Sequence, residues 1–101
     1  MSNMQKHEAL TFIHQAALQS IDEHSLNWSD DEVLDPNVYD YIAYCWEEIP
    51  FLEQLHADVI SKFDDRRQRA QLLRPIYDQL YSYYRAIALF DREVTIHNLT
   101  K

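Results

Sequence analysis

The clearest helical period of the chain lies in residues 72–90, which read LLRPIYDQLYSYYRAIALF and hold four of the seven tyrosines. At about 100° per residue, the apolar side chains of this stretch fall on one arc of a helix. The opposite side holds Arg74 and Asp78, which are four residues apart and can pair across one turn. We therefore expect a long amphipathic helix with a core face of Leu73, Ile76, Leu80, Tyr83, Tyr84, Ile87 and Val94, and with Leu72 and Phe90 at the edge of that face.

Composition restricts the fold class to helices. The 101 residues include no glycine, which disfavours β-hairpins and sandwiches because their tight turns need positive φ angles. A hydrophobic fraction of 47% is ample for one modest core. The sequence shows no basic and apolar leader and no apolar run near the roughly 18 residues of a membrane span, and Cys45 is the only cysteine. We expect one all-α domain over residues 1–101, in a cytosolic protein.

Capping signals mark the start of the second long helix. Ser29 and Glu32 have the spacing of a capping box, which predicts a short helical turn. Asp35 followed by Pro36 then starts a helix, because the carboxylate caps free amides and proline at the first position loses no hydrogen bond. On this helix we expect a core stripe of Val38, Tyr41, Ile42, Cys45 and Ile49, and a second covered edge of Tyr39, Ala43 and Trp46.

Two further prolines set the remaining boundaries. Pro50 predicts the start of a third long helix, whereas Pro75 either kinks the last helix or begins it. The predicted architecture is a compact, single-domain bundle of about four helices at roughly 7–24, 36–48, 50–63 and 65–93, the last kinked near Pro75. Residues 1–6 are expected to fray, and the tail at 94–101 extends the helix, adds a short strand or frays.

Charge is distributed unevenly along the chain. The net charge is −8, and residues 1–50 hold ten acids against one lysine. No Lys or Arg occurs between Lys6 and Lys62, an interval that contains twelve acids. A surface of one sign repels nucleic acid and anionic membranes and attracts a basic protein. We therefore expect a basic protein partner and no direct contact with nucleic acid or membrane.

Large aromatic side chains are interspersed among these acids. Aromatic anchors ringed by carboxylates suit the binding of a basic protein, since the rings supply hot spots and the carboxylates speed encounter. Glu47 and Glu48 are expected at the carboxyl end of a helix, where the dipole disfavours negative charge unless something basic binds there. The candidate partner-binding residues are Trp28, Asp30, Asp31, Glu32, Asp35, Tyr39, Asp40, Tyr44, Trp46, Glu47 and Glu48, with Trp28 and Trp46 as anchors.

These features together predict a small acidic inhibitor that neutralises a basic partner, such as a nucleic-acid-acting enzyme or a toxin. Immunity proteins, antitoxins and phage-borne inhibitors of host defence share this small size and acidity, and the comparison is by surface character rather than by motif. A structural subunit that assembles with copies of itself is an alternative from another class.

A catalytic alternative rests on Arg92 and His97, which fit the pattern R-x4-H. The pattern resembles the signature of HEPN-domain ribonucleases, helical bundles in which the arginine and the histidine meet at a dimer seam to cleave RNA. The resemblance covers these six residues and the fold class. It implies general acid/base catalysis by His97 and stabilisation of phosphate by Arg92.

Other reactive side chains do not form a recognisable site. Glu53 and His56 form one E-x-x-H pair, whereas a di-iron bundle needs two such pairs and two further glutamates. Cys45 lies within a hydrophobic stripe and is expected to be a core residue. We expect no metal and no cofactor.

Overall fold

Four helices make up the described part of the chain. The computed structural model describes residues 2–22, 29–33 and 35–99, and these residues include no strand. The elements are α1 (Ser2–Asp22), α2 (Asp30–Val33), α3 (Pro36–Lys62) and α4 (Arg66–Leu99). The predicted all-α helical bundle is therefore confirmed.

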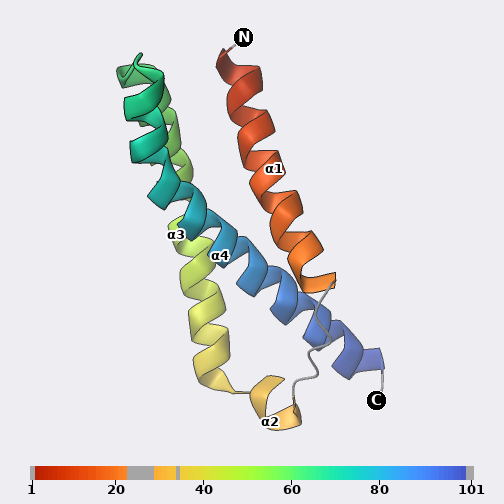
Figure 1. Cartoon of the computed structure of the whole chain (residues 1–101). Helices are drawn as coiled ribbons and strands as arrows, with labels where there is room; N and C mark the ends of the chain where they lie inside the picture. Colours follow the sequence, from red (N-terminus) through yellow and green to blue (C-terminus); the bar gives the residue numbers. More distant parts are fainter. Residues whose placement is uncertain (1, 23–28, 34, 100–101) are drawn as a thin grey trace.

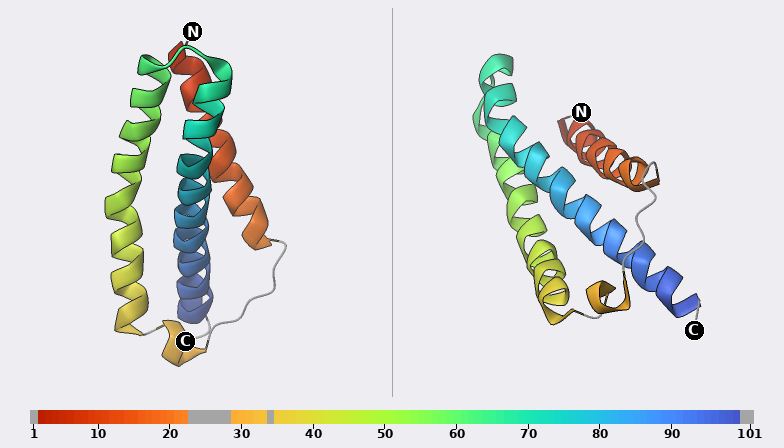
Figure 2. Two further views of the ribbon diagram at one scale, coloured as in Figure 1. Left: turned by 60° about the vertical axis from the view of Figure 1, so that its left-hand side comes forward. Right: turned by 60° about the horizontal axis from the view of Figure 1, so that its bottom comes forward.

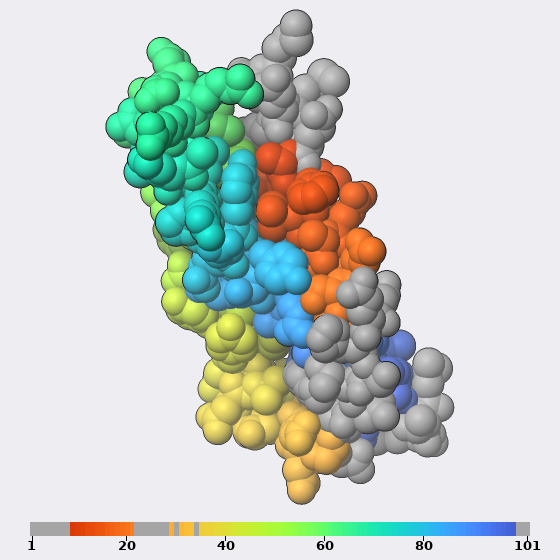
Figure 3. Space-filling model, in the orientation of Figure 1, coloured from red at the N-terminus to blue at the C-terminus, as the bar shows by residue number. Residues whose placement is uncertain are grey.

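The central element of the bundle is α4. Figures 1 and 2 show that α4 runs antiparallel to α3 and in the same direction as α1, and the right view of Figure 2 shows it between them. The space-filling view shows the same order (Figure 3). Both outer helices pack along α4, and they touch each other little. The bundle measures 52 × 25 × 19 Å and has a radius of gyration of 16.1 Å, against about 13 Å for a spherical domain of this size, so much of α1 and α3 remains in solvent.

The hydrophobic core follows the seam between α3 and α4. Leu80 and Cys45 are fully buried at its centre, and burial raises the pKa of the Cys45 thiol. Both the core face predicted in residues 72–90 and the core role of Cys45 are confirmed. The cluster consists of Ile42, Cys45, Ile49, Leu73, Ile76, Leu80, Tyr83, Ile87 and Phe90.

Both internal prolines lie within helices. Pro50 is inside α3, so the prediction of separate helices at 36–48 and 50–63 is wrong. A proline removes one helical hydrogen bond, but Ile49 before it and His56 after it are both buried, and their packing keeps the two halves in one helix. Pro75 is inside α4, and Figure 1 shows α4 bent in that part of its length, as predicted.

The continuity of α3 changes the position of two candidate residues. Glu47 and Glu48 lie in the middle of the helix and not at its carboxyl end. The dipole acts only over the first and last turns, so the argument that a basic partner must offset an unfavourable placement of these acids no longer holds. The last turn of α3 instead carries Lys62, whose positive charge suits that end.

The amino-terminal end of the chain is more helical than predicted, and the carboxyl-terminal end follows the first of its three predicted alternatives, an extended helix. The first helix begins at Ser2, and residues 2–8 contain no proline or glycine that would interrupt it. Its predicted end at residue 24 lies outside the described residues. The last helix continues through residues 94–99, where the Thr95 hydroxyl donates to the Asp91 carbonyl at 2.8 Å and Val94 packs against the core.

The predicted start signals around α2 and α3 are confirmed. The Ser29 hydroxyl accepts a hydrogen bond from the Glu32 amide at 3.3 Å, which begins the short helix α2. The Asp35 carboxylate accepts from the Asn37 amide at 2.9 Å and caps α3. Both bonds satisfy amides that a helix start leaves without partners.

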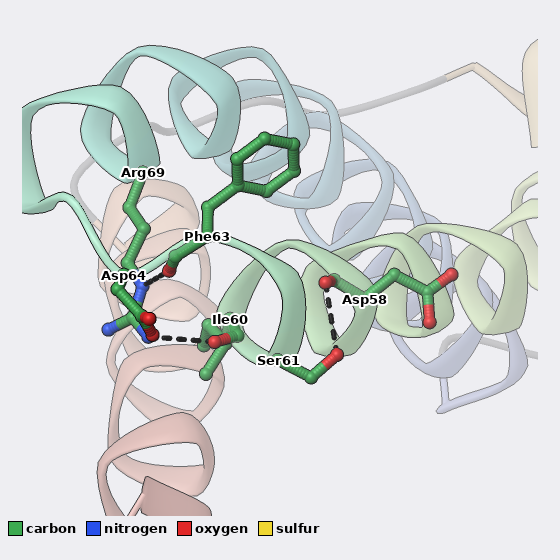
Figure 4. Close-up of polar contacts among 6 residues, drawn as sticks. All are labelled: Asp58, Ile60, Ser61, Phe63, Asp64 and Arg69. Atoms are coloured by element: carbon green, nitrogen blue, oxygen red, sulfur yellow. Dashed lines mark hydrogen bonds and ion pairs between the residues drawn. The ribbon is translucent and has the colours of Figure 1, made fainter.

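Arg69 closes the three-residue connection between α3 and α4 (Figure 4). Its guanidinium donates to the carbonyl of Ile60 at 2.7 Å and to that of Phe63, and it lies 3.8 Å from the exposed carboxylate of Asp64. These carbonyls belong to the end of α3, where helical partners are lacking. Asp65 caps the start of α4 by accepting from a backbone amide at 3.3 Å. The charged run therefore ends one helix and begins the next, as predicted.

One predicted edge of α3 is not covered. Tyr39, Ala43 and Trp46 are exposed, because α1 packs on α4 instead of lying against α3. The exposure of this edge matters for function, since large aromatic side chains remain in solvent. Of the helices in the described part of the chain, none has the length and hydropathy needed to span a membrane.

Candidate partner-binding surface

Four exposed side chains lie in one row along α3, on the side opposite the buried Ile42, Cys45 and Ile49. They are Asp40, Tyr44, Glu47 and Phe51, and we call them the outer face of α3. Their spacing of four, three and four residues places them in one row along a helix. Acid and ring alternate along this row, and Phe51, at 67% exposed, is the more exposed of its two rings.

The exposed apolar surface of the described residues is concentrated on α3. Six of the ten large hydrophobic side chains that are exposed there belong to this helix. No Lys or Arg accompanies them before Lys62. A concentration of exposed apolar side chains rimmed by charge is typical of a protein-binding surface. The six are Tyr39, Tyr41, Tyr44, Trp46, Phe51 and Leu55.

Tyr44 is held in place by its neighbours. Its ring meets the ring of Tyr83 edge to face, with centroids 6.1 Å apart. Hydrogen bonding to Tyr83 and the negative charge of Glu48 raise the pKa of the Tyr44 phenol to about 12. The hydroxyl therefore keeps its proton at neutral pH. A ring anchored in this way loses little conformational entropy on binding.

The predicted aromatic residues do not all share one face. Tyr44 and Trp46 are two residues apart, so their side chains leave α3 at about 200° to each other. Tyr39 lies on the Trp46 side, and its ring meets Phe90 edge to face at 5.0 Å. The structure thus places Tyr44 on the outer face and the pair Tyr39 and Trp46 on the flank that faces α1.

The remaining predicted residues have separate roles. Asp31 and Glu32 are exposed on α2, and Glu48 is half-buried beside Tyr44. Asp35 is engaged as the cap of α3. Trp28 and the side chain of Asp30 lie outside the described part of the structure. The structure therefore brings together Asp40, Tyr44, Glu47 and Glu48 from the predicted set.

Trp46 belongs to a groove that the sequence did not indicate. The groove lies between α1 and α3 with α4 as its floor, has a cavity volume of about 430 Å³, and we call it the α1–α3 groove. A second hollow of about 560 Å³ lies between α3 and α4 and includes Tyr41 and Arg85. The α1–α3 groove is lined by His14, Leu18, Ile21, Trp46, Ile49, Glu53, Tyr84, Ile87, Ala88 and Asp91.

Arg92 makes structural contacts within the bundle. It donates to the carbonyl of Ile21 at 2.7 Å and lies 3.4 Å from the carboxylate of the buried Glu93. The first contact ties the end of α1 to α4. Arg92 and His97 are five positions apart on an unbroken helix, so their side chains leave it about 140° apart. The catalytic roles implied by the R-x4-H pattern stay predictions.

His56 is a buried polar residue of the seam. It is 0% exposed, and its Nε2 lies 2.8 Å from the hydroxyl of Tyr77. Sequence could have indicated its burial, because His56 follows Ile42, Cys45 and Ile49 at helical spacing on the same face. Within the described residues, no three His, Cys, Asp or Glu side chains come together as metal ligands.

Comparison with known proteins identifies no relative: no family model matches the chain, no curated protein matches it, and no solved structure matches it.

Proposed function

We propose that this chain is a protein-binding inhibitor that neutralises a basic partner, in the manner of an immunity protein, an antitoxin or an inhibitor of a defence enzyme. One observation carries the proposal. The outer face of α3 alternates exposed acids with exposed rings along a helix that has no Lys or Arg before its last turn. Such a row offers both hot-spot rings and an electrostatic field to a positively charged surface.

The physical basis of inhibition is competition for a phosphate-binding surface. An enzyme that acts on nucleic acid presents Lys and Arg side chains where phosphates bind. The carboxylates of Asp40 and Glu47 would pair with these Lys and Arg side chains. Tyr44 and Phe51 would bury apolar area of the partner beside the charge pairs. The net charge of −8 would speed the encounter through long-range attraction. We place this activity in the cytosol, where a lone thiol such as that of Cys45 stays reduced.

The proposal is tested by recovering the partner. The tagged chain is incubated with lysate of its native host at low salt, eluted with a salt ramp and analysed by mass spectrometry. We expect one basic protein in stoichiometric amount, released by salt because screening weakens exposed charge pairs. The recovered protein is then assayed on nucleic acid with increasing amounts of the chain, and its activity should fall to zero near one equivalent.

Two charge reversals provide a matched comparison in the same experiment. Glu47→Lys and Asp78→Lys each change the net charge by +2, and both sites are exposed, the first on the outer face of α3 and the second on α4. Glu47→Lys should lose most of the partner, whereas Asp78→Lys should retain it. Equal recovery with both variants, or recovery of the chain alone, would contradict the proposal.

A further inference from the structure

The α1–α3 groove has the geometry of a helix-binding site. Each outer helix contributes three side chains, which follow one another at three or four residues, so that the first and the last are seven positions apart. They are His14, Leu18 and Ile21 from α1 and Trp46, Ile49 and Glu53 from α3. Side chains with this spacing lie in a row of two helical turns. The groove is therefore about two turns long and is bounded by helices on three sides.

The apolar walls of the groove are open to solvent. Trp46 is 58% exposed and Leu18 is 39% exposed, although both face an apolar floor that includes Ile87. The reason is that α1 and α3 pack on α4 and scarcely on each other. In a four-helix bundle a further helix would cover such a row.

Charge selects between possible occupants. Glu53 and Asp91 line the groove, and no Lys or Arg does so among the described residues. Glu53 acts electrostatically on Tyr84, whose pKa is raised by burial and by this negative charge. Asp91 lies seven residues beyond Tyr84 along α4, or about 10 Å. The acids therefore lie towards the two ends of an apolar strip.

We propose that the α1–α3 groove binds an amphipathic helix of the basic partner, with apolar side chains against Leu18, Ile49 and Ile87 and with Lys or Arg near Glu53 and Asp91. This inference rests on the proposed function and names the structural element of the partner. A second copy of this chain fits less well, because its residues 7–61 contain no Lys or Arg. Its arginines lie on α4, the helix that is already packed against both α1 and α3.

The test uses two synthetic amphipathic peptides and the full-length chain. One peptide carries Leu at helical spacing with Lys on its flanks, and the other has Glu in place of each Lys. Trp28→Phe leaves Trp46 as the only tryptophan, so its fluorescence reports occupation of the groove. We expect saturable binding of the Lys peptide with a spectral shift of Trp46, and no binding of the Glu peptide.

Matched variants then locate the binding site. Ala88→Phe fills the floor of the groove and should weaken binding by about tenfold or more, whereas Ala70→Phe, at an exposed site of the same helix, should have no effect. Glu53→Gln with Asp91→Asn keeps the side-chain shapes and should weaken binding by roughly fivefold and reduce its salt dependence. Asp78→Asn is the control for loss of one exposed charge. Circular dichroism shows whether each variant is folded. If Ala88→Phe does not fold, Glu53→Gln with Asp91→Asn decides the outcome.

The results separate this inference from the proposed function. Binding of the Lys peptide that is insensitive to the groove variants but weakened by Glu47→Lys would overturn the groove site and leave the inhibitor proposal standing. No binding of the Lys peptide would also overturn the groove site. A dimer in sedimentation experiments that Ala88→Phe converts to a monomer would assign the groove to a second copy and overturn the inference. Failure of the proposed function is recognised separately, by the lack of any basic protein in the salt-eluted fraction.

Discussion

The replacement Tyr77→Phe tests the hydrogen bond that joins the two helices of the seam. It removes one hydroxyl and keeps the ring, so packing changes little. His56 is fully buried, and its Nε2 lies 2.8 Å from that hydroxyl. Taking the partner from a buried polar group costs about 1–3 kcal/mol. We therefore expect the free energy of unfolding to fall by this amount.

The effect is large enough to measure in two ways. In a domain of this size, 1 kcal/mol changes the melting temperature by about 4–8 °C, so Tm should fall by roughly 5–20 °C. Urea unfolding followed by circular dichroism should show a lower midpoint and an unchanged slope. Tyr81→Phe removes the same group from a half-buried site on the same helix and should change stability by less than about 0.5 kcal/mol. If Tyr77→Phe behaved like Tyr81→Phe, the hydrogen bond would contribute nothing and our account of the seam would be refuted.

Three further predictions concern the connection, the outer face and the R-x4-H pattern. Arg69→Ala removes the hydrogen bonds to two carbonyls at the end of α3 and should lower the free energy of unfolding in urea by about 1.5–3 kcal/mol. Arg67→Ala, at an exposed site, should leave the free energy of unfolding almost unchanged. Equal losses of stability in the two variants would contradict the capping role of Arg69. The pKa of Tyr44 is raised from its ordinary value of 10.0 to about 12, so the stabilisation linked to its proton is complete below pH 10 and is lost as pH rises through 12. Ultraviolet titration of the tyrosines should therefore show one component that ionises last and that the variant Tyr44→Phe lacks. If this component persisted in Tyr44→Phe, its assignment to Tyr44 would be refuted. His97→Ala should leave partner binding unchanged, and cleavage of labelled RNA by the wild-type chain but not by this variant would favour the ribonuclease alternative.

Periodicity predicted most of the core of the molecule, although Tyr41, which was expected in the core stripe of the second long helix, is exposed. The apolar residues at helical spacing in residues 72–90 are buried because a long helix must cover its apolar arc. The caps at Ser29 and Asp35 were also predictable, since each depends on residues within one turn. Local chemistry thus determined the starts of α2 and α3.

Features that depend on tertiary packing were not predictable. The cost of Pro50 is offset by burial of side chains on both sides of it, which a local pattern does not contain. Exposure of Trp46 and Tyr39 follows from the place of α1 on α4, and helical spacing cannot say which apolar arc a neighbour covers. For the same reason no single segment of the sequence predicts the α1–α3 groove, because residues of three helices form it together.

The central claim is that the outer face of α3 draws in a basic partner, and the association rate tests it most directly. The rate of the captured partner is measured for the wild-type chain, Glu47→Lys and Asp78→Lys at low and at physiological salt. We predict fast association of the wild-type chain and Asp78→Lys that falls steeply with salt, and association of Glu47→Lys that is slower by roughly threefold to tenfold at low salt. Equal rates for all three proteins, or rates that do not respond to salt, would contradict the account.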